Sequence, residues 1–65
     1  MLKMVEHFDS KHHVILEALY GFIEDYPEKP TKWDAVNFCI GYFGAVDADH
    51  IDVIHYLVRQ NEIAD

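Results

Sequence analysis

The sequence predicts an all-α fold, a small three-helix bundle formed by a single domain over residues 1–65. Apolar residues recur at helical spacing, and no stretch shows the sustained alternation of a strand. Two breaks, at residues 26–30 and 44–49, divide the chain into three segments. A chain of 65 residues has room for only one core, so the three segments are expected to pack together.

The first segment ends before Pro27, because a proline ring clashes with a helical residue that precedes it. On a helical wheel its apolar side chains fill an arc of about 200°. The same phase continues back to Met4 and Phe8, so we expect one helix over about residues 2–25. Asp9 or Ser10 could instead cap a helix that starts near residue 10.

The second segment is predicted to form a helix over residues 31–43. Thr31 and Asp34 have the spacing of a capping box, with Asp in place of the usual Glu or Gln. Apolar side chains fill an arc of about 220°, and only a narrow polar strip remains. A helix this apolar is expected to be covered on most sides.

The third segment is predicted to form a helix over residues 49–62. Asp47 or Asp49 can cap its start and complement the positive N-terminal end of the helix. Its apolar stripe covers about 160°, which is enough for one packed face. We expect the last residues, 61–65, to fray.

The apolar arcs of the first two helices are wider than a three-helix monomer needs, and a chain this small often requires a partner subunit. Several aromatic residues lie at the edges of these arcs, which is typical of an interface. We therefore predict a homodimer. The residues assigned to self-association are Tyr20, Phe38, Tyr42 and Tyr56.

The chain is acidic, with a formal net charge of −7. Residues 1–32 hold six acids and four bases, whereas residues 33–65 hold six acids and one base. This balance disfavours direct binding to nucleic acid, which is a polyanion, and favours a basic protein partner. The acidic residues assigned to partner binding form two groups, Glu17, Glu24, Asp25 and Glu28 in the first and Asp47, Asp49 and Asp52 in the second.

These features predict a non-enzymatic interaction module that binds a larger, basic nucleic-acid-binding protein and inhibits or modulates it. Carboxylates spaced along rigid helices can imitate a row of phosphates, and small inhibitors of phages and mobile elements are the class we expect to look like this. One alternative is a structural subunit that only self-associates. Another is a winged-helix-like DNA-binding regulator, but Asp49 and Asp52 occupy the positions where a recognition helix presents base-contacting donors.

The histidines are the candidates for other chemistry. His12 and His50 fall inside apolar arcs, either as a buried pair that senses pH or acts as a base, or as boundary side chains that pack one ring face. The second interpretation is favoured. His13 and Glu17 are four residues apart and could supply half of the ligands of a metal site in a helical bundle. The other helices offer no matching motif for the second half.

We therefore expect no metal, cofactor or catalytic residue. Residues 47–58 start like a calcium loop but carry Asp52 where that loop needs glycine and Val58 where it needs glutamate. Cys39 lies in an apolar helix without a visible base, so we expect a buried structural thiol.

The sequence predicts a cytoplasmic protein. A lone cysteine is compatible with a reducing compartment. Charges interrupt the N-terminal residues early, so no signal-peptide core is present. The longest uncharged apolar run, residues 38–46, is far shorter than the roughly 20 residues that span a bilayer.

Overall fold

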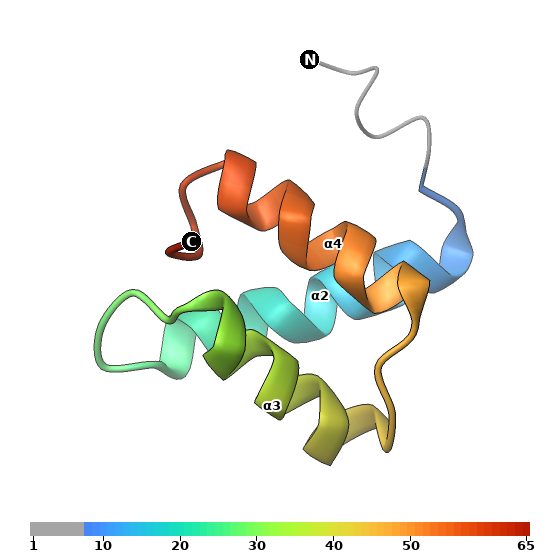
Figure 1. Ribbon diagram of the computed structural model, residues 1–65, viewed down its shortest axis with the longest axis horizontal. Coiled ribbons are helices and arrows are strands. Elements are labelled where there is room, and N and C mark those ends of the chain that lie inside the picture. Colours follow the sequence, from blue (N-terminus) through green and yellow to red (C-terminus); the bar gives the residue numbers. More distant parts are fainter. Residues whose placement is uncertain (1–7) are drawn as a thin grey trace.

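A computed structural model of the chain describes residues 8–65, which form three helices and no strand (Figure 1). The helices are α2, Ser10–Asp25, α3, Lys32–Phe43, and α4, Ala48–Arg59. Helix α4 packs against both α2 and α3. The predicted all-α class is confirmed for the described residues, and none of these helices is long and apolar enough to cross a membrane.

Helix α2 starts later than the longer of the two alternatives. Asp9 has an extended backbone, and its side chain accepts hydrogen bonds from the N–H groups of Lys11 and His12 at 3.0 and 3.2 Å. An N-cap of this kind marks the first turn of a helix, so α2 begins directly after Asp9. The helix predicted over about residues 2–25 therefore does not run through Asp9, and residues 2–7 lie outside the described part of the chain.

Helix α3 starts with the predicted capping box. Thr31 Oγ1 accepts the N–H of Asp34 at 3.1 Å, and Asp34 Oδ2 accepts the N–H of Thr31 at 2.9 Å. These two contacts satisfy two backbone donors that a helix start leaves without partners. The helix ends at Gly44, whose φ of 87° is a left-handed conformation that glycine adopts without steric cost.

The chain after α4 is ordered, contrary to the predicted fraying. The helix ends at Arg59 and not at residue 62, because the chain turns at Asn61, which has a φ of 65°. Ala64 then donates its N–H to the Pro30 carbonyl at 2.8 Å and accepts the N–H of Lys32 at 2.9 Å. This backbone pairing holds the C-terminal residues against the segment that precedes α3.

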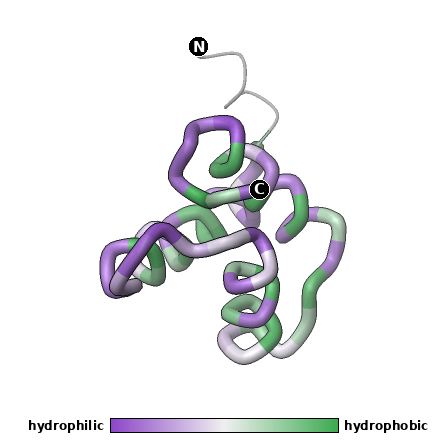
Figure 2. Tube along the Cα trace, turned by 60° about the vertical axis from the view of Figure 1, so that its left-hand side comes forward, coloured by the Kyte–Doolittle hydropathy of each residue, from purple (hydrophilic) through white to green (hydrophobic). Residues whose placement is uncertain are grey.

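The core is built around α4, which has the most clearly amphipathic sequence of the three helices. Hydrophobic and hydrophilic stretches alternate along the helices, as Figure 2 shows. Two histidines, His12 and His50, are the polar residues buried together with this core. The buried apolar side chains come from all three helices and from the C-terminal segment; they are Ile15, Leu19, Ala35, Cys39, Val53, Ile54, Leu57 and Ile63.

Helix α3 is less covered than its sequence leads one to expect. Only Ala35 and Cys39 of its 12 residues are buried. Trp33, Tyr42 and Ile40 are 67%, 65% and 50% exposed. Within one chain, α2 and α4 therefore cover one side of α3 and leave large apolar side chains of the other side in solvent.

Candidate functional site

The same four-residue motif, Asp-x-x-His, opens both α2 and α4. In each copy the aspartate is the N-cap, and the histidine three residues later occupies the position that Glu or Gln takes in the usual capping box. His12 Nδ1 accepts the N–H of Asp9 at 3.1 Å, and His50 Nδ1 accepts the N–H of Asp47 at 3.1 Å. Each histidine ring is thus fixed by the first turn of its own helix.

A second contact at Nδ1 sets the possible proton positions in both rings. His12 Nδ1 lies 2.9 Å from Asp9 Oδ1, and His50 Nδ1 lies 2.7 Å from Asp47 Oδ1. A ring protonated only at Nε2 accepts the backbone N–H, whereas a ring protonated at Nδ1 donates to the carboxylate. Either way, Nδ1 is held by the cap and Nε2 points away from it.

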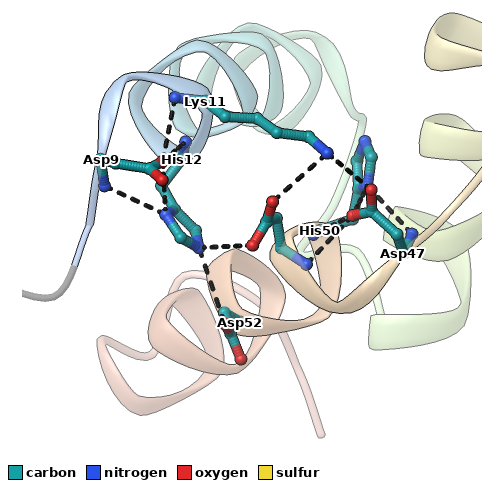
Figure 3. A network of polar contacts seen from close by, with 7 residues as sticks. Asp9, Lys11, His12, Asp47, His50 and Asp52 are labelled. Carbon is teal, nitrogen blue, oxygen red and sulfur yellow. Dashed lines mark hydrogen bonds and ion pairs between the residues drawn. The ribbon is translucent and has the colours of Figure 1, made fainter.

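The Nε2 atom of His12 faces two carboxylates of α4, as Figure 3 shows for Asp52. It lies 3.2 Å from Asp49 Oδ1 and 3.6 Å from Asp52 Oδ2. The histidine is 7% exposed, and its ring stacks on Phe8 with 4.8 Å between centroids. Nε2 itself is buried and has no partner of hydrogen-bonding geometry within residues 8–65.

The Nε2 atom of His50 lies in different surroundings. This histidine is 5% exposed, and its ring packs edge-on against Phe43 with 4.9 Å between centroids. It borders a hollow of about 400 Å³ whose apolar walls include Val14, Ile15 and Phe43. Its Nε2 is also buried without a hydrogen-bond partner in the described residues, and no ion pair joins it to a carboxylate.

Lys11 connects the two helix starts. Its Nζ donates to Asp47 Oδ2 at 2.6 Å and lies 3.3 Å from Asp49 Oδ2 (Figure 3). The Lys11 ammonium, followed by the His50 ring, holds the pKa of Asp47 well below its usual range. Hydrogen bonds to Asp47 and then Asp49 raise the pKa of Lys11. These two acids are therefore partly neutralised within the chain.

The two predicted acidic groups differ in this respect. Asp47, Asp49 and Asp52 do lie together, and Lys11 and His12 of α2 face them. The other group is exposed, and within residues 8–65 its members form no ion pair. These exposed acids, which we call the α2 acidic group, are Glu17, Glu24, Asp25 and Glu28.

The residues predicted for self-association are split between exposed and packed positions. Tyr20 and Tyr42 are exposed. Phe38 is partly buried and stacks between Phe22 and Tyr42, with ring centroids at 4.6 and 5.2 Å. Tyr56 is partly buried against Phe8 at 5.3 Å. A single chain does not test the predicted homodimer.

Two other candidates from the sequence lie outside this site. His13 and Glu17 are both exposed. Cys39 is fully buried, as predicted, and burial raises the pKa of its thiol to about 11.

Sequence reasoning missed the cluster of His12, Asp49 and Asp52 because its members come from two helices. Two signals were available. The spacing of Asp9 and His12 recurs at Asp47 and His50, and Asp49 and Asp52 are three apart on one helix face. Neither signal reports which residues of α2 and α4 face each other.

The chain matches no protein-family model, no curated protein and no solved structure. The residues of the chain itself are therefore the basis for a functional proposal.

Proposed function

We propose that this chain is a non-enzymatic protein-binding module that docks a basic segment of a larger protein on the outward face of α3. The observation that carries this proposal is the exposure of Trp33 and Ile40. They are seven residues apart, so they lie on the same side of the helix. Exposed tryptophan and aliphatic side chains are typical anchors of protein interfaces.

The composition of α3 supports a docking role for this face. No charged residue occurs between Asp34 and Asp47, although the chain as a whole is highly charged. Gly41 is exposed beside Ile40, and nothing lies within 4 Å of the position a Cβ would take. A glycine inside a helix costs about 1 kcal/mol relative to alanine, and no contact within the described chain requires it. A partner chain can approach the helix backbone closely there.

Charge indicates what kind of partner fits. The net charge is −7, so charge favours a basic protein on this face over the second copy of the chain that the apolar arcs alone would predict. Three members of the α2 acidic group, Glu24, Asp25 and Glu28, are exposed and precede Trp33 by five to nine residues. They lie at the end of α2 and in the loop that leads into α3, so cationic groups of a partner can meet them beside the apolar anchor.

A nucleic-acid-binding protein is the partner class that this combination favours, because its cationic site is exposed when no nucleic acid is bound. Occupation of that site by the chain would inhibit or modulate the larger protein. The α2 acidic group is better suited to this role than Asp47 and Asp49, which already pair with Lys11. Direct DNA reading through α4 is not favoured, because Asp52 and His55 are its exposed polar residues near the start and middle of the helix.

The proposal is tested with two variants of exposed apolar residues. The double variant Trp33→Ser/Ile40→Ser changes the outward face of α3, and Val14→Ser changes an exposed apolar residue of α2 as a matched control. Proteins captured from the source cell by each chain are quantified at low and high salt. We expect basic proteins that are retained by the wild type and by Val14→Ser, lost from the double variant, and weakened by salt.

Two outcomes would contradict the proposal. If the double variant and Val14→Ser capture the same proteins as the wild type, the outward face of α3 is not a docking surface. If sedimentation shows that the wild type is a dimer and the double variant a monomer, a second copy occupies this face in place of a basic partner.

A further inference from the structure

We propose that His12, Asp49 and Asp52 bind a divalent transition-metal ion, with zinc as the best fit, at the contact between α2 and α4. This site is distinct from the outward face of α3 and goes beyond the proposed protein binding. It also departs from the sequence-based expectation of no metal site, which considered only motifs within single helices.

The positions of the three ligand atoms fit such an ion. His12 Nε2 is 3.2 and 3.6 Å from the nearest oxygens of Asp49 and Asp52, and potential ligand atoms of all three residues lie within 4.8 Å of one another. Zinc bonds of about 2.0–2.2 Å in tetrahedral geometry place ligand atoms about 3.3–3.6 Å apart. The two distances from His12 Nε2 are close to this range, and rotation of the carboxylates can bring the third separation, which is within 4.8 Å, into it.

The unsatisfied Nε2 atom of His12 is a second indication that this residue is a ligand, beyond its proximity to the two carboxylates. Its Nε2 is buried, lacks a hydrogen-bond partner in the described residues, and lies 3.2 and 3.6 Å from the nearest oxygens of the two carboxylates. An unsatisfied buried polar atom is costly in a folded protein. A metal ion held between Nε2 and the carboxylates would satisfy all three groups.

Asp9 supplies the outer contact that metal-binding histidines normally have. With an ion on Nε2, the ring carries its proton on Nδ1, which is 2.9 Å from Asp9 Oδ1. A carboxylate in this position fixes the orientation of the ring and raises the basicity of the ligand nitrogen. The N-cap of α2 would therefore also serve as the support of the metal ligand, while the Phe8 stack holds the ring plane.

The donor set and the exposure of the site narrow the choice of ion. One imidazole nitrogen and two carboxylate oxygens suit zinc and similar transition ions, whereas magnesium and calcium prefer oxygen ligands alone. The Asp52 side chain is 61% exposed, so the ion can be reached from solvent and water can complete its coordination. Lys11 lies near the other oxygen of Asp49, and its positive charge lowers the affinity without blocking Oδ1.

The chain offers an internal control for this site. His50 has the same capping box and the same unpartnered Nε2, but within residues 8–65 its ring pairs with no carboxylate other than that of its own N-cap, Asp47. A general affinity of capped histidines for metal would therefore involve both rings, whereas the proposed site involves His12 alone.

The test uses the full, untagged chain, titrated with zinc and with cobalt by calorimetry and by visible absorption of the bound cobalt. Magnesium serves as the oxygen-preferring comparison. His12→Gln and His50→Gln both keep a side chain that can complete a capping box. Asp52→Asn alters an exposed ligand and leaves both caps intact, so it keeps the test decisive if His12→Gln unfolds. Circular dichroism reports the fold of each variant.

We expect one zinc or cobalt ion per chain for the wild type and for His50→Gln, and no comparable binding of magnesium. Affinity should fall at least tenfold in His12→Gln and in Asp52→Asn. In Asp9→Asn, which keeps a good N-cap, it should fall by about tenfold because the outer carboxylate is lost.

Equal zinc affinity in the wild type and in folded Asp52→Asn or His12→Gln would overturn the proposal, because the ion would then sit on other histidines. Failure of the wild type to bind zinc or cobalt saturably would also overturn it.

Discussion

The starts of α2 and α4 use one local motif in two different environments. At α2, the capped ring of His12 faces Asp49 and Asp52 of another helix. At α4, the capped ring of His50 faces Phe43 and an apolar hollow. The motif fixes the ring in both cases, and the neighbouring element decides what the free nitrogen meets. A cap can therefore remain structural, or it can aim a ligand at a site, without any change in its own sequence pattern.

If both caps fix their rings in the same way, the rings of His12 and His50 should both stabilise the folded protein. His12→Ala and His50→Ala should each lower the free energy of unfolding by about 2–3 kcal/mol, because each removes a buried ring and the acceptor of a cap hydrogen bond. The corresponding Gln variants should recover part of this loss. Urea unfolding measures both, and a cost below about 0.5 kcal/mol at either position would show that this ring does not stabilise its helix.

Lys11 provides a second way to sharpen the comparison, because it bridges Asp47 of one cap and Asp49 of the proposed metal site. Lys11→Met should raise the zinc affinity about threefold to tenfold by removing a nearby positive charge. The same change should lower stability slightly through the loss of its ion pairs. Unchanged or weaker zinc binding, measured by calorimetry, would indicate that Lys11 positions Asp49 more than it repels the ion.

Acid should affect the two caps unequally. The Lys11 ammonium and then His50 lower the pKa of Asp47, while the N–H of His12 is the main cause that lowers the pKa of Asp9. A depressed folded pKa stabilises the protein above the ordinary value of 3.8, and this contribution is lost as pH falls below it.

The free energy of unfolding should therefore decrease below about pH 4, and Asp47→Asn should flatten this decrease more than Asp9→Asn. Asparagine is an equally good N-cap, so neither change removes a cap. The measurement is urea unfolding of the three proteins at neutral pH and at about pH 3. An equal loss of stability between the two pH values in both variants would show that the ion pair of Lys11 with Asp47 contributes little.

The smallest effect is expected at Cys39, which lies away from both caps in α3. Its thiol is fully buried, and burial raises its pKa to about 11, so alkylation near neutral pH should require opening of the fold. The labelling rates of His12→Gln and His50→Gln should rise only by the factor that their measured loss of stability accounts for. Rapid labelling of either variant would mean that its other effects come from loss of the fold.

Local features of the sequence predicted most of the fold. The capping box of Thr31 and Asp34 and the break before Pro27 depend on neighbours within a few residues, so pattern alone identifies them. The pattern left Asp47 and Asp49 as alternative caps of α4, and the N-cap is Asp47. His12 and His50 were placed in the apolar arcs of their helices, but the favoured interpretation as boundary side chains was wrong, because both residues are buried and their Nε2 atoms have no hydrogen-bond partner in the described residues. The start of α2 was misjudged because the apolar phase continues past Asp9, although the backbone is extended there.

Contacts between segments far apart in the chain could not be predicted from the sequence. The return of Ala64 to Pro30 depends on a turn at Asn61 and on the place of α3 beside α4. The reach of Lys11 to Asp47 and the approach of His12 to Asp49 depend on the packing of α2 against α4. Periodicity gives the face of a helix that is buried but not the residues of another helix that it meets.

The most direct test of the difference between the two caps is a long-range ¹H–¹⁵N spectrum of the imidazole rings recorded as zinc is added to the full chain. The account predicts that Nε2 of His12 shifts with saturation at one zinc per chain, that its proton is then on Nδ1, and that His50 is unchanged. Equal shifts of both rings, or no shift of His12 at saturating zinc, would contradict it.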